Sequence, residues 1–395
     1  MFKTMAINAG SSSLKWKLYK MPEESVLASG MVDRIGLPES LFSVTDGDGE
    51  TVKKTADIAD HDQAVQLLLK QLIEQQIIKD FKEITGVGHR VAAGGESFSD
   101  SVVVTDEVLA EIEKLAELAP LHNPANAMGI RAFKNLLPDI VSVAVFDTSF
   151  HQTMNKVQYL YSIPYAFYEK HHVRKYGYHG TSHKYVSQRA AEMLDRPLEE
   201  LKIISCHLGN GASVCAVDGG KSVDTSMGFT PLAGLTMGTR AGDIDVSLLP
   251  FLMEKEGITA ISDMIEILNR DSGLKGVSGL SSDMRDLHAK EADDPQAALA
   301  LRIFEDRVKK YIGAYAALMN GVDAIVFTAG IGENDIQTRE HIINGLSYLN
   351  AFIDPERNDC RGVEKLISSE HSDVSILLIP TDEEVMIARD VERLK

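Results

Sequence analysis

The most informative stretch of the sequence is Ile203-Ile-Ser-Cys-His-Leu-Gly-Asn-Gly-Ala-Ser-Val-Cys-Ala-Val-Asp-Gly219. It predicts a buried strand that ends near His207, a tight turn at Gly209-Asn210-Gly211 and a second strand from Ala212. Asn-Gly between two apolar runs is a strong hairpin signal. Glycine lets a ligand approach the backbone closely, and turn amides that point one way can hold a phosphate. The alternative is a plain surface hairpin.

The N-terminus repeats this plan. Thr4–Ile7 is predicted as a strand, Asn8–Ser13 as a small polar turn, and Leu14–Tyr19 as an alternating second strand. Two such hairpins roughly two hundred residues apart indicate a duplicated domain with a ligand-binding cleft between the copies. A third element, Ala324–Asn334, is a buried strand that runs into a Gly-x-Gly turn and a helix, which is another place to hold a nucleotide.

Composition narrows the class of protein. A chain of 395 residues with 44% hydrophobic and 25% charged residues is typical of a globular protein of two domains. The net charge of −18 disfavours nucleic acid and anionic membranes as partners. We find no apolar run of membrane-spanning length and no signal peptide, so we expect a cytoplasmic protein. The three cysteines lack metal spacing, and Cys206 and Cys215 would lie opposite each other around an Asn210-Gly211 loop.

Three further segments have features of functional sites. The apolar run Ile140–Phe146 predicts a central strand that delivers Asp147 at its end, where open α/β sheets place their chemistry. The alternative for Asp147 is a helix N-cap. Asp224–Asp245 is a long, glycine-rich segment without periodicity, and such a segment inside a compact domain usually has a function. Arg240 is its one basic residue. Gly273–Ser282 is predicted as a polar loop.

The motifs together resemble those of the acetokinase family, within the actin, Hsp70 and sugar-kinase superfamily. They cover nearly the whole chain in order: Asn8-Ala-Gly-Ser-Ser-Ser-Leu-Lys15, Gly88-His-Arg90, Phe146-Asp147-Thr-Ser-Phe-His151, Tyr176-Gly-Tyr-His179-Gly-Thr-Ser-His183, His207-Leu-Gly-Asn-Gly211, Met237-Gly-Thr-Arg240-Ala-Gly-Asp243, Gly330-Ile-Gly-Glu-Asn334 and Pro380-Thr-Asp-Glu383-Glu384.

The resemblance implies an α/β fold of duplicated ribonuclease-H-like domains, with mixed sheets flanked by helices and the active site in the interdomain cleft. It implies an N-terminal domain at 1–150, on which a C-terminal helix at about 383–395 packs back, and a nucleotide-binding and dimerisation domain at 151–382. The implied assembly is a homodimer.

The implied reaction is reversible, Mg²⁺-dependent transfer of the ATP γ-phosphoryl group to acetate, with Mn²⁺ as a possible substitute. Catalysis would involve Asp147, His179 and Arg240, and metal binding would involve Asn8 and Glu383. The carboxylate site would comprise Arg90, Ala92, Leu121, His122 and Pro231. ATP would be held by Ser12, Lys15, His207, Leu208, Gly209, Asn210, Gly211, Asp283, Met284, Arg285, Gly330, Ile331, Gly332, Glu333 and Asn334.

Elementary chemistry fits these roles. Phosphoryl transfer is catalysed mainly by positioning and electrostatic stabilisation, and arginines in glycine-rich loops suit it. Carboxylic acids are ionised at neutral pH, so no general base is needed, and we expect Asp147 to orient an arginine or a metal-bound water. For His179 the alternative is a structural histidine, for Glu383 a helix cap and for Asn8 a stabiliser of its turn.

Two departures bear on substrate choice. Where the family usually has His-Arg-Val-Val-His-Gly-Gly, this chain has Ala92 and Ala93, and Tyr178 replaces a usual phenylalanine. If Ala92 lines the methyl pocket, acetate remains the main substrate with unusually good use of propionate. The alternatives are therefore a propionate or broad short-chain carboxylate kinase and, from another class, an actin- or Hsp70-like ATPase.

Overall fold

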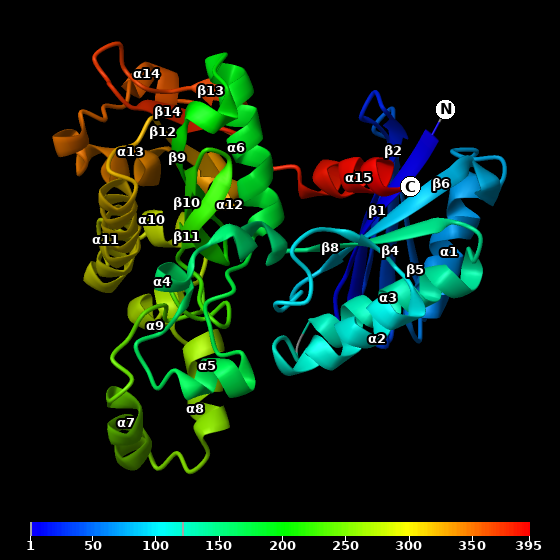
Figure 1. The fold of residues 1–395 in the computed structure, drawn as a ribbon, viewed down its shortest axis with the longest axis horizontal. Coiled ribbons are helices and arrows are strands. Elements are labelled where there is room, and N and C mark those ends of the chain that lie inside the picture. The colour runs from blue at the N-terminus through cyan, green and yellow to red at the C-terminus, as the bar shows by residue number, and fades with distance from the viewer. Residues whose placement is uncertain (1, 121) are drawn as a thin grey trace. The chain divides into compact units, whose positions relative to one another are not determined.

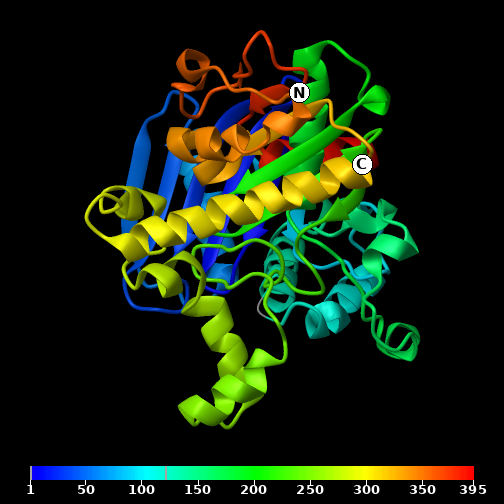
Figure 2. The same ribbon diagram turned by 90° about the vertical axis from the view of Figure 1, so that its left-hand side faces the viewer.

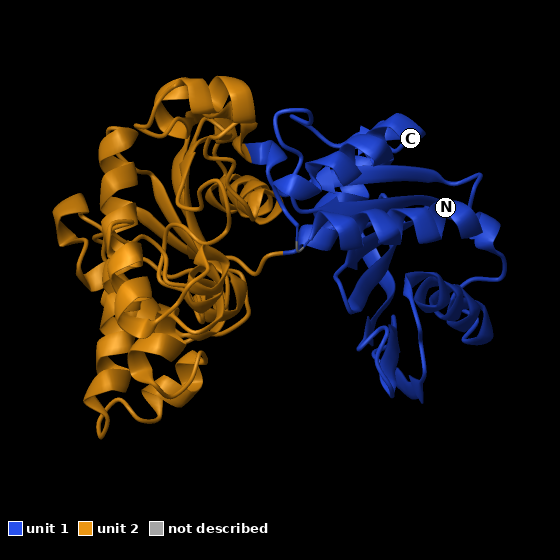
Figure 3. Ribbon diagram, turned by 90° about the horizontal axis from the view of Figure 1, so that it is seen from below, with its two compact units in different colours: residues 1–150, 382–395 blue, residues 151–381 orange. Residues whose placement is uncertain are grey.

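The computed structural model describes residues 2–120 and 122–395, and the chain divides into two compact units (Figure 3). Unit 1 comprises Met1–Phe150 and Asp382–Lys395, and unit 2 comprises His151–Thr381. Each unit is built on a mixed sheet with helices on both faces (Figure 1), so the predicted fold class is confirmed.

In unit 1, the described residues form an eight-stranded sheet in the order β5-β4-β3-β2-β1-β6-β8-β7. The strands are β1 Phe2–Ala9, β2 Ser13–Met21, β3 Ser25–Asp33, β4 Ser40–Asp46, β5 Thr51–Ala56, β6 Ile84–Val91, β7 Val102–Val103 and β8 Val141–Phe146. Strands β1, β6 and β8 are parallel neighbours, with Ile7 opposite His89 and Val91 opposite Phe146. Their carboxyl ends therefore bring Asn8, Arg90 and Asp147 to one edge of the sheet.

The two faces of this sheet carry different helices. Helices α1 (His61–Glu74) and α3 (Asn123–Leu136) cover the face that carries the buried side chains of Ile7 and Trp16, and α2 (Asp106–Lys114) packs on α3. Helix α15 (Glu383–Leu394) covers the other face. Its approach depends on Gly88 of β6, because a Cβ there would lie 2.3 Å from a methyl carbon of Ile387.

In unit 2, the described residues form a six-stranded sheet in the order β11-β10-β9-β12-β14-β13. The strands are β9 Lys202–Leu208, β10 Ala212–Asp218, β11 Lys221–Thr225, β12 Ala324–Thr328, β13 Lys365–Leu366 and β14 Ser375–Leu378. The run β11-β10-β9-β12-β14 repeats the order and directions of β3-β2-β1-β6-β8, as expected for the predicted duplication.

The helices of unit 2 are α4 Lys156–Tyr159, α5 Ala166–His171, α6 Gly180–Leu194, α7 Leu248–Glu256, α8 Ile261–Arg270, α9 Gly273–Ser278, α10 Met284–His288, α11 Pro295–Leu318, α12 Ala329–Asn334, α13 Ile336–Asn344 and α14 Pro355–Asn358. Figure 2 shows α11 running across one face of the sheet, where Phe304 and Val308 pack with Cys206 and Val214 in a buried core. Helix α6 packs against the opposite face, and its His183 bonds Ser205 and Ser213 there.

The central hairpin of unit 2 corrects one detail of the sequence analysis. Its turn is the full Gly209-Asn210-Gly211, since Leu208 pairs with Ala212. This register places Cys206 opposite Val214, so the two-residue Asn210-Gly211 loop that would have set the two cysteines opposite each other does not form. A turn one residue longer than Asn-Gly shifts every partner by one and moves the two cysteines to opposite faces. Both thiols are free and buried.

Candidate active site and nucleotide pocket

The first candidate cluster lies at the strand-end edge of unit 1. The Nη2 and Nε atoms of Arg90 donate to Asp147 at 2.6 and 3.0 Å, and Nη1 donates to Asn8 Oδ1 at 3.4 Å. Arg90 Nε also lies 4.0 Å from Glu383 Oε2, at the start of α15. Two-bond pairing fixes the plane of the guanidinium, because its donors form a rigid fork. Asp147 is buried, and both of its carboxylate oxygens accept hydrogen bonds from Arg90.

The charges of this cluster are strongly coupled. Attraction by Asp147 raises the pKa of Arg90, so the guanidinium stays cationic at any relevant pH. The pKa of Glu383 is raised to about 7, mainly by burial. Attraction by Arg90 lowers this pKa, and repulsion by Asp147 raises it further. Asp147, Glu384 and Asp382 all raise the pKa of Glu383 and only Arg90 lowers it by attraction, so the charge around this carboxyl is mainly negative.

The loop after Arg90 is held by buried polar side chains that the sequence analysis did not identify. The backbone N–H groups of Ala92 and Ala93 donate to Oδ1 of Asn126 and Asn123, each at 3.0 Å. The N–H of Gly94 donates to Thr148 Oγ1 at 2.9 Å. Ala92 is 7% exposed and packs in a small cluster with Ala93. His122 is exposed just before α3, and Leu121 lies outside the described residues.

The second cluster surrounds the hairpin turn of unit 2. A Cβ added to Gly211 would lie 3.4 Å from Arg240 Nη1 and 3.6 Å from His179 Nε2, so both groups reach the same point of the turn. His179 begins α6 with φ of 57°. Its Nδ1 lies 2.9 Å from Ser213 Oγ, and its ring stacks on His207 with centroids 4.1 Å apart.

Arg240 lacks a counter-charge within unit 2. Its Nη1 donates to the carbonyl oxygen of Pro231 at 3.3 Å and contacts Met237 Sδ, and no ion pair to a carboxylate is found among the residues that the structure describes in this unit. Burial alone lowers the pKa of Arg240, which matches the lack of a nearby acid. A partly buried cation without a carboxylate partner is complementary to a bound anion.

The loop that carries Arg240 is fixed by backbone hydrogen bonds to α8 and α9. Ala241 N–H donates to the carbonyl of Leu268 at 2.9 Å. The first N–H groups of α9 donate back to the loop, from Leu274 to Met237 and from Lys275 to Gly238. The predicted polar loop at Gly273–Ser282 is therefore partly wrong, because α9 forms within it against these carbonyls.

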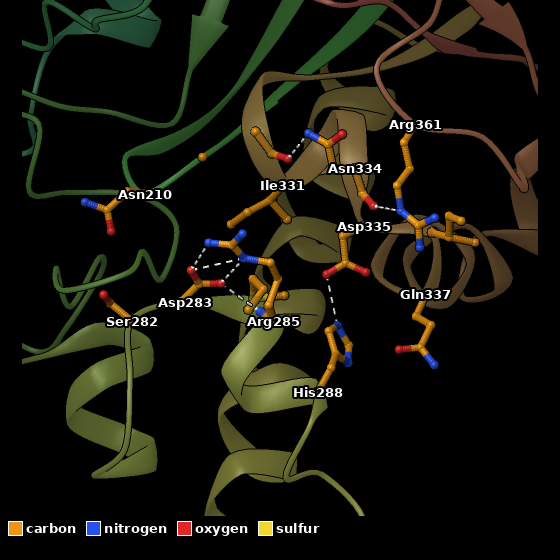
Figure 4. Close-up of a pocket in the computed structure, with 14 residues that line it drawn as sticks. Asn210, Ser282, Asp283, Arg285, His288, Ile331, Asn334, Asp335, Gln337 and Arg361 are labelled. Atoms are coloured by element: carbon orange, nitrogen blue, oxygen red, sulfur yellow. Dashed lines mark hydrogen bonds and ion pairs between the residues drawn. The ribbon is translucent and has the colours of Figure 1, made fainter. Parts of the chain in front are cut away.

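A pocket of about 940 Å³ lies wholly in unit 2, beside the same hairpin turn (Figure 4). Its volume is that of a pocket for a nucleotide-sized ligand. Eight residues predicted to bind ATP line it: Gly209, Asn210, Asp283, Met284, Arg285, Gly330, Ile331 and Asn334. Six lining residues were not predicted: Ser282, His288, Asp335, Ile336, Gln337 and Arg361.

The remaining predicted ATP residues lie elsewhere. His207 and Leu208 precede the turn, and Gly211 is its last residue. Gly332 and Glu333 belong to α12. The carbonyl of Gly332 accepts from Arg339, and the carboxylate of Glu333 accepts from the Thr381 N–H. Ser12 and Lys15 are exposed in the first hairpin of unit 1. The predicted Gly-x-Gly turn is instead the first turn of α12, which begins directly after β12 with Ala329 at φ of 63°.

Ion pairs organise the wall of the pocket. His288 Nε2 lies 2.9 Å from Asp335 Oδ2, and Arg361 Nε donates to the carbonyl of Asn334 at 3.1 Å (Figure 4). The hydrogen bond to Asp335 raises the pKa of His288, against its burial. Burial alone would raise the pKa of Asp335, but the hydrogen bond from His288 and the Thr338 N–H lower it overall.

We expect the His288→Asn variant to be destabilised more at pH 6 than at pH 9. A histidine whose folded pKa is raised stabilises fully below its unfolded pKa of about 6.5, and this contribution is lost as the pH rises through the folded pKa. The loss at pH 6 is about 1–2 kcal/mol, measured by urea unfolding. Lys275→Gln, which removes the exposed pair with Asp271, is the control and should cost under about 0.5 kcal/mol at both pH values. Equal destabilisation by His288→Asn at both pH values would contradict the assigned pair.

Comparison with known proteins matches this geometry to a family. The sequence model of the Acetokinase family matches residues 3–389. The chain belongs to the acetokinase family. An acetate kinase of Enterococcus faecalis is 64% identical over 396 residues and covers both chains fully.

Solved structures of the acetokinase family superpose on the whole chain. An acetate kinase of Porphyromonas gingivalis is 46% identical with a TM-score of 0.96, and all of both chains is covered. A propionate kinase of Francisella tularensis is 40% identical with a TM-score of 0.93, also over all of both chains. The similarity therefore extends to kinases named for two different carboxylates.

A metal ion implied by the acetokinase family fits the oxygen atoms of unit 1. Asn8 Oδ1 and Glu383 supply hard oxygen donors, which suit Mg²⁺. Burial is the main cause of the raised pKa of Glu383, and the acids beside it outnumber Arg90, so a divalent cation there would stabilise the ionised carboxylate. Within the described residues there is no group of three or more His, Cys, Asp or Glu that could hold a metal by itself, so substrate oxygens or water would complete the coordination.

The lengths and hydropathies of the helices bear on membrane insertion. None of those in residues 2–120 and 122–395 is both long enough and apolar enough to cross a membrane.

Proposed function

We propose that the protein transfers the γ-phosphoryl group of ATP reversibly to acetate, which gives acetyl phosphate and ADP. The observation that carries this proposal is the turn Gly209–Gly211 of unit 2. One side of it lines the pocket, while Arg240 Nη1 and His179 Nε2 reach Gly211. A nucleotide in the pocket would direct its phosphates along a backbone turn toward two hydrogen-bond donors, one of them a cation without a counter-charge.

Each side chain has a part in this reaction. The pocket binds the nucleoside, and the glycine turn holds the phosphates through its N–H groups. Arg240 and His179 stabilise the equatorial oxygens of the phosphoryl group during transfer. Ser12 and Lys15 of the first hairpin are proposed as further phosphate contacts.

In unit 1, Arg90 binds the carboxylate of acetate, and Asp147 holds the Arg90 guanidinium in one plane. Asn8 and Glu383 would hold Mg²⁺, which would supply positive charge to neutralise the phosphates. His122, Ala92 and Pro231 are proposed to border the acetate.

The reaction needs no general base. Acetate is already ionised, so one of its oxygens attacks the γ-phosphorus in line as the bond to the ADP oxygen breaks. No side chain then has to remove a proton from acetate, and the raised pKa of Glu383 follows from its burial and its acidic neighbours. An ATPase of the actin or Hsp70 type has no use for the paired Arg90 and the unpaired Arg240, and is disfavoured for that reason.

The carboxylate preference is the finer part of the proposal. A full-length similarity to a propionate kinase keeps that alternative open. Ala92, in place of the usual valine, leaves room for a further methylene if its side chain faces the acyl group.

A panel of carboxylates assayed with ATP and Mg²⁺ tests the function. We expect acetate-dependent ADP formation with acetyl phosphate trapped as hydroxamate, and propionate used at about a tenth of the acetate efficiency or better. Ala92→Val should lower kcat/KM for propionate more than for acetate, and Ala93→Val is the matched control. ADP release without a carboxylate requirement would refute the kinase, whereas equal losses for both acids would show that Ala92 does not face the acyl group.

We further propose a cytoplasmic homodimer. Large apolar side chains are exposed on several elements of unit 2, among them Val157 of α4, Phe167 of α5, Phe251 of α7 and Ile261 of α8. Burial of exposed apolar side chains drives protein association. The free cysteines fit a reducing compartment. A monomeric mass in light scattering would contradict the dimer.

A further inference from the structure

Four side chains of unit 2 form a continuous hydrogen-bonded chain that ends at His179. Ser205 Oγ lies 2.9 Å from His183 Nδ1, and His183 Nε2 lies 2.8 Å from Ser213 Oγ. Ser213 Oγ lies 2.9 Å from His179 Nδ1. Ser205, His183 and Ser213 are fully buried between α6 and the strands β9 and β10.

The direction of this chain follows from its buried end. Ser205 Oγ has His183 Nδ1 as its one side-chain hydrogen-bond partner among the described residues. A buried hydroxyl that does not donate its proton is costly, so Ser205 donates to Nδ1. Neutral His183 then carries its proton on Nε2 and donates it to Ser213. The single proton of the Ser213 hydroxyl is thereby left for His179 Nδ1.

We infer that Ser205, His183 and Ser213 are positioning residues that hold the proton of His179 on Nε2. His179 thus presents an N–H, and not a lone pair, at the point of the Gly211 turn that Arg240 Nη1 also reaches. The assignment of the proton concerns the free protein, and only its consequence for turnover rests on the proposed function.

The middle of the chain is neutral, because burial lowers the pKa of His183 well below the ordinary value. Arg240 Nη1 and His179 Nε2 both reach the same point of the Gly211 turn. A neutral Nε2–H can stabilise a phosphoryl oxygen without first having to be protonated.

The Ser205→Ala variant tests this inference at a distance from any ligand. Without the terminal donor, His183 can keep its proton on Nδ1, and the chain can reverse so that His179 Nε2 loses its proton. Ser187→Ala is the matched control, because Ser187 is also buried and bonds His183, but through the backbone carbonyl oxygen. Ser205→Thr keeps the hydroxyl and should restore the native behaviour, and Ser213→Ala breaks the chain at its middle.

Nitrogen NMR of protein labelled with [¹⁵N]histidine reports the tautomer without any substrate. We expect the Nε2–H form of His179 in the native protein, in Ser187→Ala and in Ser205→Thr, and the Nδ1–H form in part of Ser205→Ala. With ATP and acetate, kcat of Ser205→Ala should fall about tenfold, while KM values stay within about twofold.

Several outcomes are decisive. An Nδ1–H tautomer in the native protein, or an unchanged tautomer in both Ser205→Ala and Ser213→Ala, would overturn the inference. Equal loss of kcat in Ser205→Ala and Ser187→Ala would show a merely structural role. If the tautomers behave as expected and no acetate-dependent turnover is found, the proposed function fails and the proton assignment stands.

Discussion

Replacing Arg240 with alanine is expected to lower kcat about a thousandfold and to leave KM for acetate within about threefold. A positive group aimed at the migrating phosphoryl gains most of its interaction in the transition state, so its loss appears in kcat. Steady-state kinetics with ATP and acetate as varied substrates measures both constants.

The effect of replacing Arg240 on the rate can be separated from an effect on stability. Its side chain pairs with no carboxylate among the described residues of unit 2, so its removal leaves no buried acid unpaired there. Stability should therefore change little, and the loss of rate can be assigned to the missing cation. Arg240→Lys keeps the charge but not the planar fork, and we expect it to recover only part of the rate.

Arg90→Ala is the contrasting variant. It removes the partner of Asp147 and the nearest cation to Glu383, so KM for acetate should rise at least about tenfold while kcat falls less. If Arg90→Ala lowers mainly kcat and Arg240→Ala raises mainly KM, the two assignments are reversed and the proposed roles are wrong.

Much of the sheet architecture could be predicted from the sequence, because the residues at and next to the end of a strand mark where it stops. An apolar run that stops at a polar residue predicted Asp147, and Asn-Gly between two apolar runs predicted the Gly209–Gly211 turn. Arg90 was predicted from the resemblance to a family motif. Parallel pairing of β6 with β8 then brings Arg90 and Asp147 together without any further information. The cross-strand partner of Cys206 could not be predicted, because it depends on whether the turn has two residues or three.

Other parts of the site depend on contacts across long sequence distances. Asn123 and Asn126 hold the loop after Arg90 only because α3 lies over it, although their spacing of three does put both amides on one helix face. Arg361 reaches the pocket from a segment with no recognisable motif, through a bond to Asn334. His288 and Asp335 become a pair only when α10 and α13 meet.

Gly273→Ala is expected to destabilise unit 2 by about 3 kcal/mol and to lower kcat about a hundredfold. Gly273 has φ of +61°, and a Cβ there would lie 2.1 Å from the carbonyl oxygen of Met237 and 2.7 Å from that of Arg240. Both atoms are backbone, so the loop itself would have to move, and the position of the Arg240 guanidinium would move with it. Urea unfolding and steady-state kinetics measure the two effects.

Gly279, at the other end of α9, supplies the control. Its φ of +64° is nearly the same, but a Cβ there would meet no atom within 4 Å. Gly279→Ala therefore measures the left-handed backbone strain alone, about 1 kcal/mol, and should leave kcat unchanged. The difference between the two variants isolates the contact of α9 with the Arg240 loop. If Gly273→Ala loses stability but keeps the kcat of Gly279→Ala, the close packing of α9 fixes the fold and does not set the position of Arg240.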